Sequence, residues 1–305
     1  MRRLLAIITA IAVLVGVLAG MNWDKLAPAI GPVLGLQSTA APTAGTGPMP
    51  VGSQISGVQP TAAPTAIVVP TPQQHFRYAL IDPTTSTDKS FRESMKADII
   101  AAVRSYVPPK PPDPKVGVPS VTGLQLTVRL VATNSLAYGQ QSVAVSIPSV
   151  PGLPERPDMT VTGALDPGGP YDTWKKSNAE WSTAYDAATA AAASATQTLG
   201  ALNLNVDEWS GITAGAAALT LLAPAQGDVQ FAVLSDLDEN RPPQPANFNG
   251  HPILVVQPDP VGDIGRWDSL FNQFSSWASK SGSGTITRVR PENAMPAIAT
   301  FITGK

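Results

Sequence analysis

Two segments of the sequence place oxygen-bearing side chains directly after short apolar runs. The first covers residues 82–86, with the sequence DPTTS, and it follows the apolar run at 78–81. Its spacing D-x-T-x-S supplies one carboxylate and two hydroxyls, from Asp82, Thr84 and Ser86. Oxygen ligands of this kind suit a hard divalent cation such as Mg²⁺, which retains part of its water shell. The segment is therefore a candidate metal-binding loop.

The second segment is Ser235-Asp236, which directly follows the strand-like run Val229–Leu234. If the two runs are neighbouring parallel strands, Asp82 and Asp236 lie at the same edge of the sheet. Open α/β folds bind their ligands at the carboxyl ends of the strands, where the strand order reverses. The pair of segments therefore predicts two carboxylates at one ligand-binding edge.

A plainer interpretation of both segments requires no metal. Asp82 would open a proline turn, and Ser86 or Thr87 would cap the helix that begins near residue 88. Asp236 would likewise cap a helix. The sequence alone leaves both interpretations open.

Composition excludes several classes of site. The chain has 305 residues, no Cys and only two His, His75 and His251. Disulfides, thiol nucleophiles and zinc ribbons are therefore excluded. Two histidines are also too few for a metal site built mainly from histidines. Charged residues make up 14% of the chain and the net charge is −2, which gives no sign of nucleic-acid binding.

The chain begins with a segment typical of export or membrane anchoring. Met1-Arg2-Arg3 is positive, and residues 4–20 are almost entirely apolar. The run is intermediate between a cleavable signal and a spanning helix, so residues 1–23 are predicted to be a signal peptide or an anchor. An uncleaved anchor would place the rest of the chain outside the cell as a single-pass membrane protein, and cleavage would make it secreted.

A low-complexity spacer is predicted from residue 24 to residue 74. It is rich in Pro, Ala, Thr, Gly and Ser, and TAAPTA occurs at both 39–44 and 61–66. Such a composition buries too little apolar surface to fold, and its prolines favour an extended chain. The folded domain is then predicted to span residues 75–305.

Periodicity and propensity predict alternating strands and helices in this domain. Helices are expected at 88–106, 172–199, 210–222, 263–280 and 292–302, with Asp172 or Thr173 capping the second of these. Strands are expected at 78–81, 124–132, 142–147, 229–234, 252–257 and 284–289, with a further extended stretch at 159–161. This order predicts an α/β fold with a doubly wound, mostly parallel sheet, one antiparallel edge strand and helices on both faces.

The order of elements resembles the von Willebrand factor type A fold. In that family one strand ends in D-x-S-x-S and a later strand ends in (S/T)-D-G, and together they form a metal-ion-dependent adhesion site. Asp82, Thr84 and Ser86 match the first motif, and Ser235-Asp236 match the last, although Leu237 stands where Gly is expected.

The family's middle motif, G-T-D-x-x-G-A-L, is matched less closely. The segment 210–217 reads SGITAGAA, so Ser210 or Thr213 must stand in for the motif threonine. The resemblance implies that a divalent cation, Mg²⁺ or else Ca²⁺ or Mn²⁺, is held by Asp82, Thr84, Ser86, Asp236 and these substitutes. It also implies a protein or cell-surface partner that offers an acidic residue to the cation. A metal-free structural or assembly module of the same fold remains the alternative.

Two enzyme patterns are incomplete in the sequence. A phosphohydrolase of the haloacid dehalogenase type would use Asp82 as nucleophile, but Thr84 occupies the place of its second Asp, and its lysine would have to be Lys175 or Lys176. The segment 86–89 matches S-x-x-K, yet no S-D-N or K-T-G triplet accompanies it. We therefore expect a non-enzymatic binding domain with no catalytic residues.

Overall fold

A computed structural model describes residues 74–84, 86–112, 116–131, 142–157, 168–204, 211–258 and 264–305. The predicted signal or anchor, the spacer up to residue 73 and the predicted extended stretch at 159–161 lie outside the described residues. Among the helices in the described ranges, none has the length and apolar character needed to cross a membrane.

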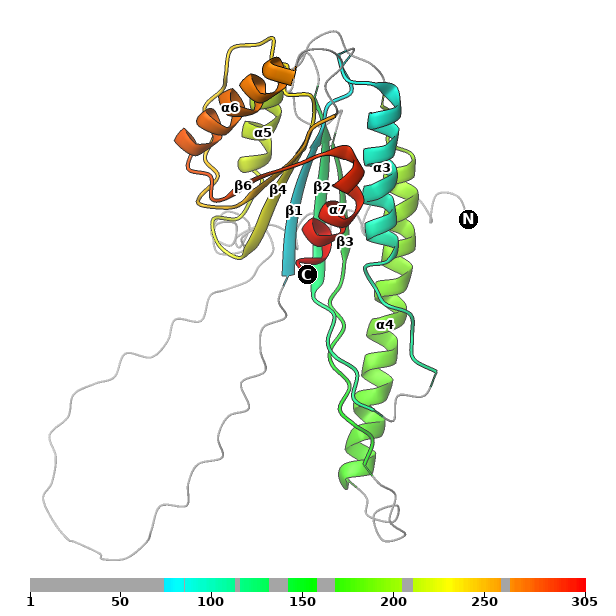
Figure 1. Cartoon of the computed structure of the whole chain (residues 1–305). Helices are drawn as coiled ribbons and strands as arrows, with labels where there is room; N and C mark the ends of the chain where they lie inside the picture. Colours follow the sequence, from blue (N-terminus) through cyan, green and yellow to red (C-terminus); the bar gives the residue numbers. More distant parts are fainter. Residues whose placement is uncertain are drawn as a thin grey trace, which may run out of the picture. The chain divides into compact units, whose positions relative to one another are not determined.

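A six-stranded sheet forms the centre of the domain (Figure 1). Its strands are β1 Gln74–Ile81, β2 Gly123–Leu130, β3 Ser142–Ile147, β4 Asp228–Leu234, β5 Ile253–Val256 and β6 Ile286–Val289. The order across the sheet is β3-β2-β1-β4-β5-β6, and every pair is parallel except β2 with β3. The predicted fold class is confirmed, including the antiparallel edge strand and the reversal of strand order between β1 and β4.

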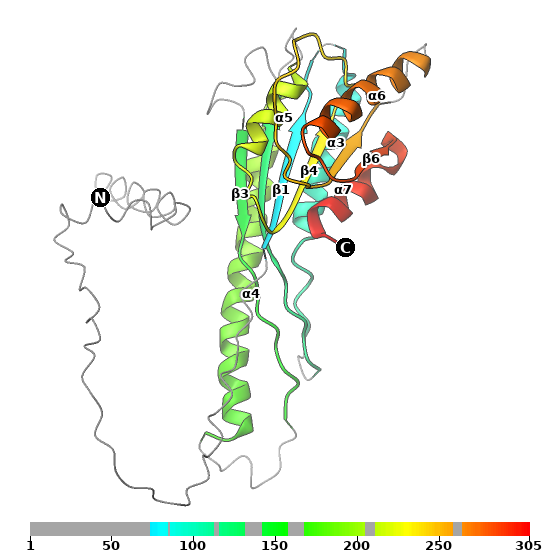
Figure 2. The ribbon, with the colours of Figure 1, turned by 90° about the vertical axis from the view of Figure 1, so that its left-hand side faces the viewer.

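Helices cover both faces of the sheet (Figures 1 and 2). They are α3 Lys89–Arg104, α4 Pro170–Gly200, α5 Ile212–Thr220, α6 Ile264–Lys280 and α7 Ala294–Thr303, with the short 3₁₀ helix η2 at Pro291–Asn293. Helices α3, α4 and α7 lie on one face, and α5 and α6 lie on the other. This is a doubly wound arrangement in which neither face of the central strands meets water.

Side-chain alternation along β1 explains why two cores form. Ala79 and Ile81 pack into the core beneath α3, α4 and α7, whereas Tyr78 and Leu80 pack into the core beneath α5 and α6. All four are buried. A strand buried on both faces reads as a continuous apolar run, which is why residues 78–81 were identifiable as a strand from sequence.

Two predicted helix caps differ from the structure. Asp88, rather than Ser86 or Thr87, caps α3, and its carboxylate accepts a hydrogen bond from the Ser90 N–H at 3.0 Å. Helix α4 begins at Pro170 rather than near Asp172, because proline suits the first turn, where its missing N–H leaves no bond unmade. Asp172 instead accepts a hydrogen bond from the Gly168 N–H at 3.1 Å.

Candidate functional site

The carboxyl ends of β1 and β4 lie side by side, as the strand order requires. The backbone N–H of Asp82 donates to Leu234 O at 3.0 Å, and that of Ser235 donates to Val256 O at 3.1 Å. Asp82 and Ser235 are completely buried, and Asp236 is 1% exposed. The sheet therefore fixes the backbone at the first residue of each motif.

The first motif forms a tight loop around the Asp82 carboxylate. The Thr84 N–H donates to Asp82 Oδ1 at 3.1 Å, and the hydroxyls of Thr84 and Ser86 are 3.1 Å apart. Arg92, a buried residue of α3, donates from Nη1 to the carbonyl oxygens of Thr84, at 3.0 Å, and Thr87. Arg92 carries no signal in the sequence that marks it as a positioning residue, because it is separated from the motif and has the character of an ordinary helix residue.

The second motif joins the first through a direct hydrogen bond. The Ser235 hydroxyl donates to Asp82 Oδ2 at 2.6 Å and accepts from the Leu237 N–H at 2.9 Å. The Asp238 N–H donates to Asp236 Oδ1 at 3.0 Å. The turn that makes these bonds places Leu237 at φ 64°, a left-handed conformation that favours glycine. Leu237 thus adopts a glycine-like backbone at the position where the resembled motif has Gly.

Burial and mutual repulsion shift the acids of this site toward their neutral forms. Burial, followed by the charge of Asp236, raises the pKa of Asp82 to about 6, against the opposing hydrogen bonds from Ser235 and Thr84. Burial also raises the pKa of Asp236, although hydrogen bonds from the Asp238 N–H and the Ser86 hydroxyl act in the other direction. The Ser86 contact completes a connected set of side chains that runs from Asp82 to Asp236.

Of the two candidate residues of the middle motif, the structure describes only Thr213. Ser210 lies outside the described residues. Thr213 is in the first turn of α5 and is 5% exposed; its N–H donates to Glu239 Oε2 at 2.7 Å, and its Oγ1 accepts from the Gln244 N–H at 3.1 Å. Thr213 therefore reaches the same edge through Glu239, rather than by a direct bond to the first motif.

Glu239 is a further acid of this edge that the sequence motifs do not contain. Burial raises its pKa, bonds from Thr213 and the Arg241 N–H lower it, and the negative charge of Asp82 raises it. The charge of the first motif therefore adds to the effect of burial on Glu239. The only signal in the sequence is its position three residues after Asp236, which suggests added negative potential but does not identify a ligand.

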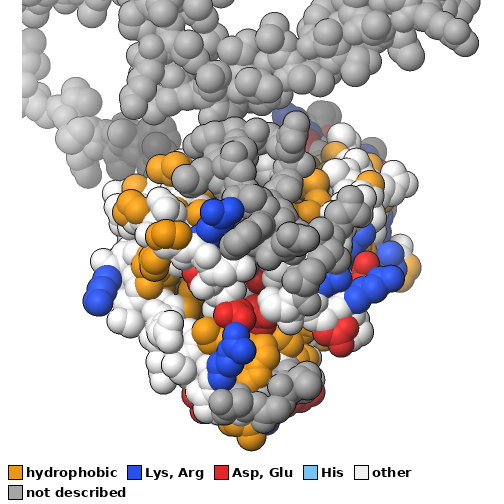
Figure 3. All heavy atoms as spheres, turned by 90° about the horizontal axis from the view of Figure 1, so that it is seen from above, with side chains coloured by type: hydrophobic (Ala, Val, Ile, Leu, Met, Phe, Trp, Pro, Cys, Tyr) orange, Lys and Arg blue, Asp and Glu red, His pale blue; other side chains and the backbone are white. Residues whose placement is uncertain are grey.

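Charged residues of both signs surround the buried acids. Asp238 Oδ2 forms an ion pair with Arg266 Nη2 at 2.5 Å, and both side chains are partly exposed. Viewed onto this end of the molecule, acidic side chains lie beside Lys and Arg side chains (Figure 3). The edge therefore combines buried carboxylates with an exposed rim of mixed charge.

The donors at this edge fit a hard cation that keeps part of its water shell. Among the described residues, no group of three or more His, Asp or Glu side chains lies close enough together to hold a metal ion. Two carboxylates and the hydroxyls of Thr84 and Ser86 are nevertheless connected, and oxygen donors with bound waters are what Mg²⁺ takes. A cation here would also relieve the repulsion between Asp82 and Asp236.

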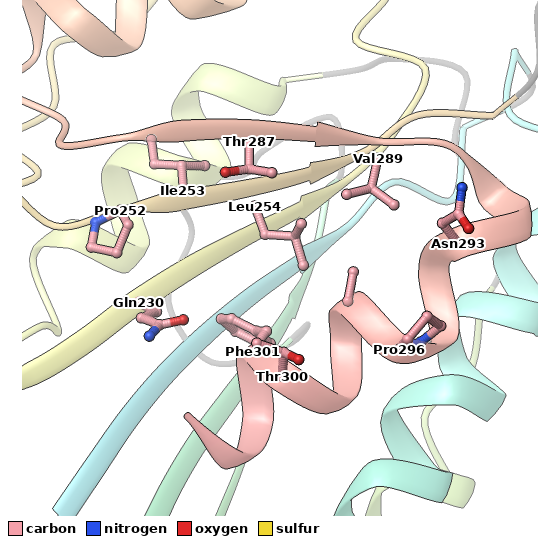
Figure 4. A pocket seen from close by; sticks show the side chains of 11 residues that line it. Gln230, Pro252, Ile253, Leu254, Thr287, Val289, Asn293, Pro296, Thr300 and Phe301 are labelled. Carbon is pink, nitrogen blue, oxygen red and sulfur yellow. The ribbon is translucent and has the colours of Figure 1, made fainter. Parts of the chain in front are cut away.

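A hollow beneath α7 does not offer comparable chemistry. It has a volume of about 410 Å³ and lies between α7 and the strands β4, β5 and β6 (Figure 4). Leu254, Phe301 and Pro296 contribute to its wall, and none of the residues that line it is charged. The carboxyl edge of β1 and β4 is therefore the better candidate for a polar functional site.

Neither a known family model nor a curated protein sequence matches the chain. The assignment of a function therefore rests on the fold and on the residues of the edge described above.

Proposed function

We propose that this protein is a non-enzymatic binding domain of the von Willebrand factor A type, carried outside the cell on an N-terminal membrane anchor. A divalent cation at the carboxyl edge of β1 and β4, Mg²⁺ or else Ca²⁺ or Mn²⁺, joins the domain to an acidic residue of a protein or cell-surface partner. Asp82, Thr84, Ser86 and Asp236 hold the cation, directly or through water, and Thr213 and Ser210 belong to the same site.

The hydrogen-bonded connection from Asp82 to Asp236 carries this proposal. Ser235 bonds to Asp82, Thr84 bonds to Ser86, and Ser86 bonds to Asp236, so two distant segments make one set of oxygen donors. Buried carboxylates with raised pKa values are costly to keep charged without a counter-ion. A bound cation supplies that counter-ion and leaves a coordination position for a partner's carboxylate.

The direction of β1 supports a role in binding a partner. The strand begins at Gln74, where the spacer joins the domain, and ends at Ile81, next to the candidate site. The first described residue of the domain and the candidate site are therefore at opposite ends of β1 (Figure 1). A domain held by the predicted anchor and spacer would present the site away from the membrane.

The haloacid dehalogenase alternative gains no support from the placement of its lysine. Lys175 and Lys176 lie in the first turns of α4, and Lys175 Nζ is 3.5 Å from Asp172 Oδ1. The first turns of α4 lie far from the carboxyl edge of the sheet (Figure 1). A metal-free assembly module of the same fold remains the competing proposal.

Titration calorimetry of the full chain with MgCl₂, MnCl₂ and CaCl₂ tests the proposal. We expect one saturable cation site, with an affinity in the micromolar to millimolar range. Asp82→Asn and Asp236→Asn should each weaken binding by at least about tenfold, since each removes a charged oxygen donor.

Asp186→Asn is the matched control for these variants. Asp186 is an exposed acid of α4 that pairs with Lys110 at 3.1 Å, away from the carboxyl edge. Its replacement should leave cation binding unchanged. Absence of saturable heat in the wild-type chain, or equal binding by the wild type and Asp82→Asn, would favour the metal-free module.

A further inference from the structure

A cluster of polar side chains lies near the amino ends of β1 and β4, away from the candidate cation site. Arg77 of β1 is completely buried. Its Nη1 donates to Asp228 O at 2.8 Å and its Nη2 donates to Asp228 Oδ2 at 2.9 Å, at the first residue of β4. Its Nε donates to the carbonyl oxygen of Phe301, in the last turn of α7. One buried guanidinium therefore joins β1, β4 and the end of α7.

The end of α7 depends on this contact, because the last carbonyl groups of a helix have no partner within the helix. Phe301 O is one of these, and Arg77 Nε supplies its hydrogen bond. Gly304, which follows the helix, has a φ of 70°. A Cβ built on it would lie 2.9 Å from His75 Cε1 and 3.1 Å from Arg77 Nη2. The end of α7 is therefore packed directly against two side chains of β1.

His75 is the member of the cluster whose charge can change near neutral pH. Its Nδ1 donates to Asp228 Oδ2, and because a carboxylate only accepts, this nitrogen carries the proton of the neutral ring. A second proton must therefore go to Nε2, from which no described residue accepts a hydrogen bond. Arg77 and Asp228 already balance each other, so the second proton leaves one positive charge in excess.

The groups that face His75 favour its neutral form. Burial has the largest effect and lowers its pKa, and the positive charge of Arg77 acts in the same direction. The hydrogen bond and the charge of Asp228 raise the pKa, and the charge of Lys305 lowers it, with a lowered pKa as the result. Tyr106 meets the ring edge-on at 6.4 Å between centroids, and burial raises the pKa of Tyr106, so it stays uncharged.

Acid therefore opposes the native contact in a defined pH range. Between the lowered pKa of native His75 and the ordinary value of 6.5, the native state binds fewer protons than the unfolded state, so stability is lost as the pH falls. The carbonyl end of α7 attracts positive charge, but Arg77 already supplies it there.

Asp228 titrates in a different range. Burial alone would raise its pKa, but the bonds and charges of Arg77 and His75 lower it. Its contribution to stability is therefore lost only as the pH falls from the ordinary value of 3.8 through the lowered pKa. Within the cluster, the change between pH 7 and about pH 5 belongs to His75.

The cluster and the end of α7 border a cavity of about 650 Å³. Its lining includes the segment 116–122, Trp181 and Tyr185 of α4, His75, Thr303 and Lys305. Thr303 and Lys305 belong to the end of α7 and the residues beyond it. A displacement of that end would therefore widen the cavity.

We propose that His75, Arg77 and Asp228 form an acid-sensitive latch, which holds the end of α7 on the sheet at neutral pH and loosens when His75 takes up a proton. The latch controls access to the cavity beside it. It does not depend on a cation at the carboxyl edge.

Hydrogen exchange of the full chain at pH 7 and pH 5 tests the latch. After correction for the intrinsic rate at each pH, the amides of residues 300–304 should lose protection in acid. The loss should reach roughly tenfold for each unit by which folding lowers the pKa of His75. His75→Asn keeps an N–H that can donate to Asp228 but does not titrate, so its protection should be equal at both pH values.

His251→Asn is the matched control, because His251 is the only other histidine of the chain. Its ring contacts Phe231, and its Nε2 is 3.3 Å from Pro224 O. This variant should keep the wild-type response at the end of α7. An equal response in the wild type and His75→Asn, or a response lost in His251→Asn, would contradict the proposal.

Proton NMR of the two histidine rings gives a second test, which needs no stable variant of His75. His251→Asn identifies which of the two titrations belongs to His75. The pKa of His75 in the wild-type protein should lie below 6.5. A pKa at or above 6.5 would overturn the latch, because acid would then leave the contact unchanged or strengthen it.

Discussion

Asp82 is the residue on which the candidate site depends, because its carboxylate joins both loops while being completely buried. Burial and the nearby charge of Asp236 disfavour its charged form, and together they raise its pKa to about 6. At neutral pH the site therefore holds a charged group that the fold alone stabilises poorly. A cation that binds there would compensate this cost.

A pH dependence of stability follows from the raised pKa of Asp82. Between the unfolded value near 4 and about 6, the native state binds more protons than the unfolded state, so unfolding free energy is lost as pH rises through this window. In chelator, Asp82→Asn should therefore gain stability relative to the wild type by about 2 kcal/mol between pH 4 and pH 7.

Urea denaturation of both proteins in EDTA at a series of pH values measures this difference. Taking the difference between the two proteins cancels the titration of groups that they share. A difference that stays constant with pH, or that grows in favour of the wild type, would show that the fold stabilises charged Asp82 without a cation.

Residue spacing predicted Asp82, Ser235 and Asp236 at one edge, because strand ends fix where such residues lie. It did not predict that Leu237 would adopt a left-handed φ of 64°. The Leu237 side chain is 3% exposed in the core beneath α5 and α6, and its N–H bonds to Ser235 Oγ. Packing and this hydrogen bond impose a conformation that the residue type alone disfavours.

Helix α5 carries Thr213 to the site and must lie close to β1 to do so. Gly215 permits this approach, because a Cβ built on it would lie 2.7 Å from Leu80 Cδ1. Leu80 is completely buried and has little room to move. The small residue in the middle of α5 therefore sets the spacing between the helix and the sheet.

Gly215→Ala should destabilise the domain by about 1–3 kcal/mol, since it overpacks a filled core despite the better helix propensity of alanine. Gly200→Ala is the matched control, because nothing lies within 4 Å of a Cβ built on this helical glycine of α4. The control should be neutral or more stable by up to about 1 kcal/mol. Urea midpoints compare the two, and equal effects would refute the close approach of α5.

Helices and strands were predictable from sequence where the spacing of their apolar residues follows the face that is buried. The strands at 78–81 and 229–234 and the amphipathic helix α3 were confirmed, because their apolar residues alternate or recur toward the cores. Caps were less predictable: Ser86, Thr87 and Asp88 are adjacent, and each has a side chain that can accept an N–H. Arg92 donates hydrogen bonds to the carbonyl oxygens of Thr84 and Thr87, and the Ser86 hydroxyl bonds to Asp236. These bonds hold the loop before Asp88, and Asp88 then caps the helix.

At the scale of the whole molecule, β1 connects two sites of different character. Its amino end begins the described part of the domain, and His75 there lines an apolar, aromatic cavity of about 650 Å³. Its carboxyl end meets the buried acids of the proposed cation site. Strand polarity thus separates this cavity from the face that is proposed to meet a partner. Sequence order could predict this separation, whereas the cavity depends on the 116–122 segment, whose path no motif specifies.

The presence of a cation between the ends of β1 and β4 is the central claim, and anomalous diffraction at the manganese edge tests it most directly. Crystals of the protein soaked in MnCl₂ should show an anomalous peak in contact with the hydroxyls of Thr84 and Ser86, beside Asp82 and Asp236. Crystals of Asp82→Asn should lack it. Manganese bound only at exposed acids such as Asp186, with no peak at the carboxyl edge, would contradict the account and favour a metal-free scaffold.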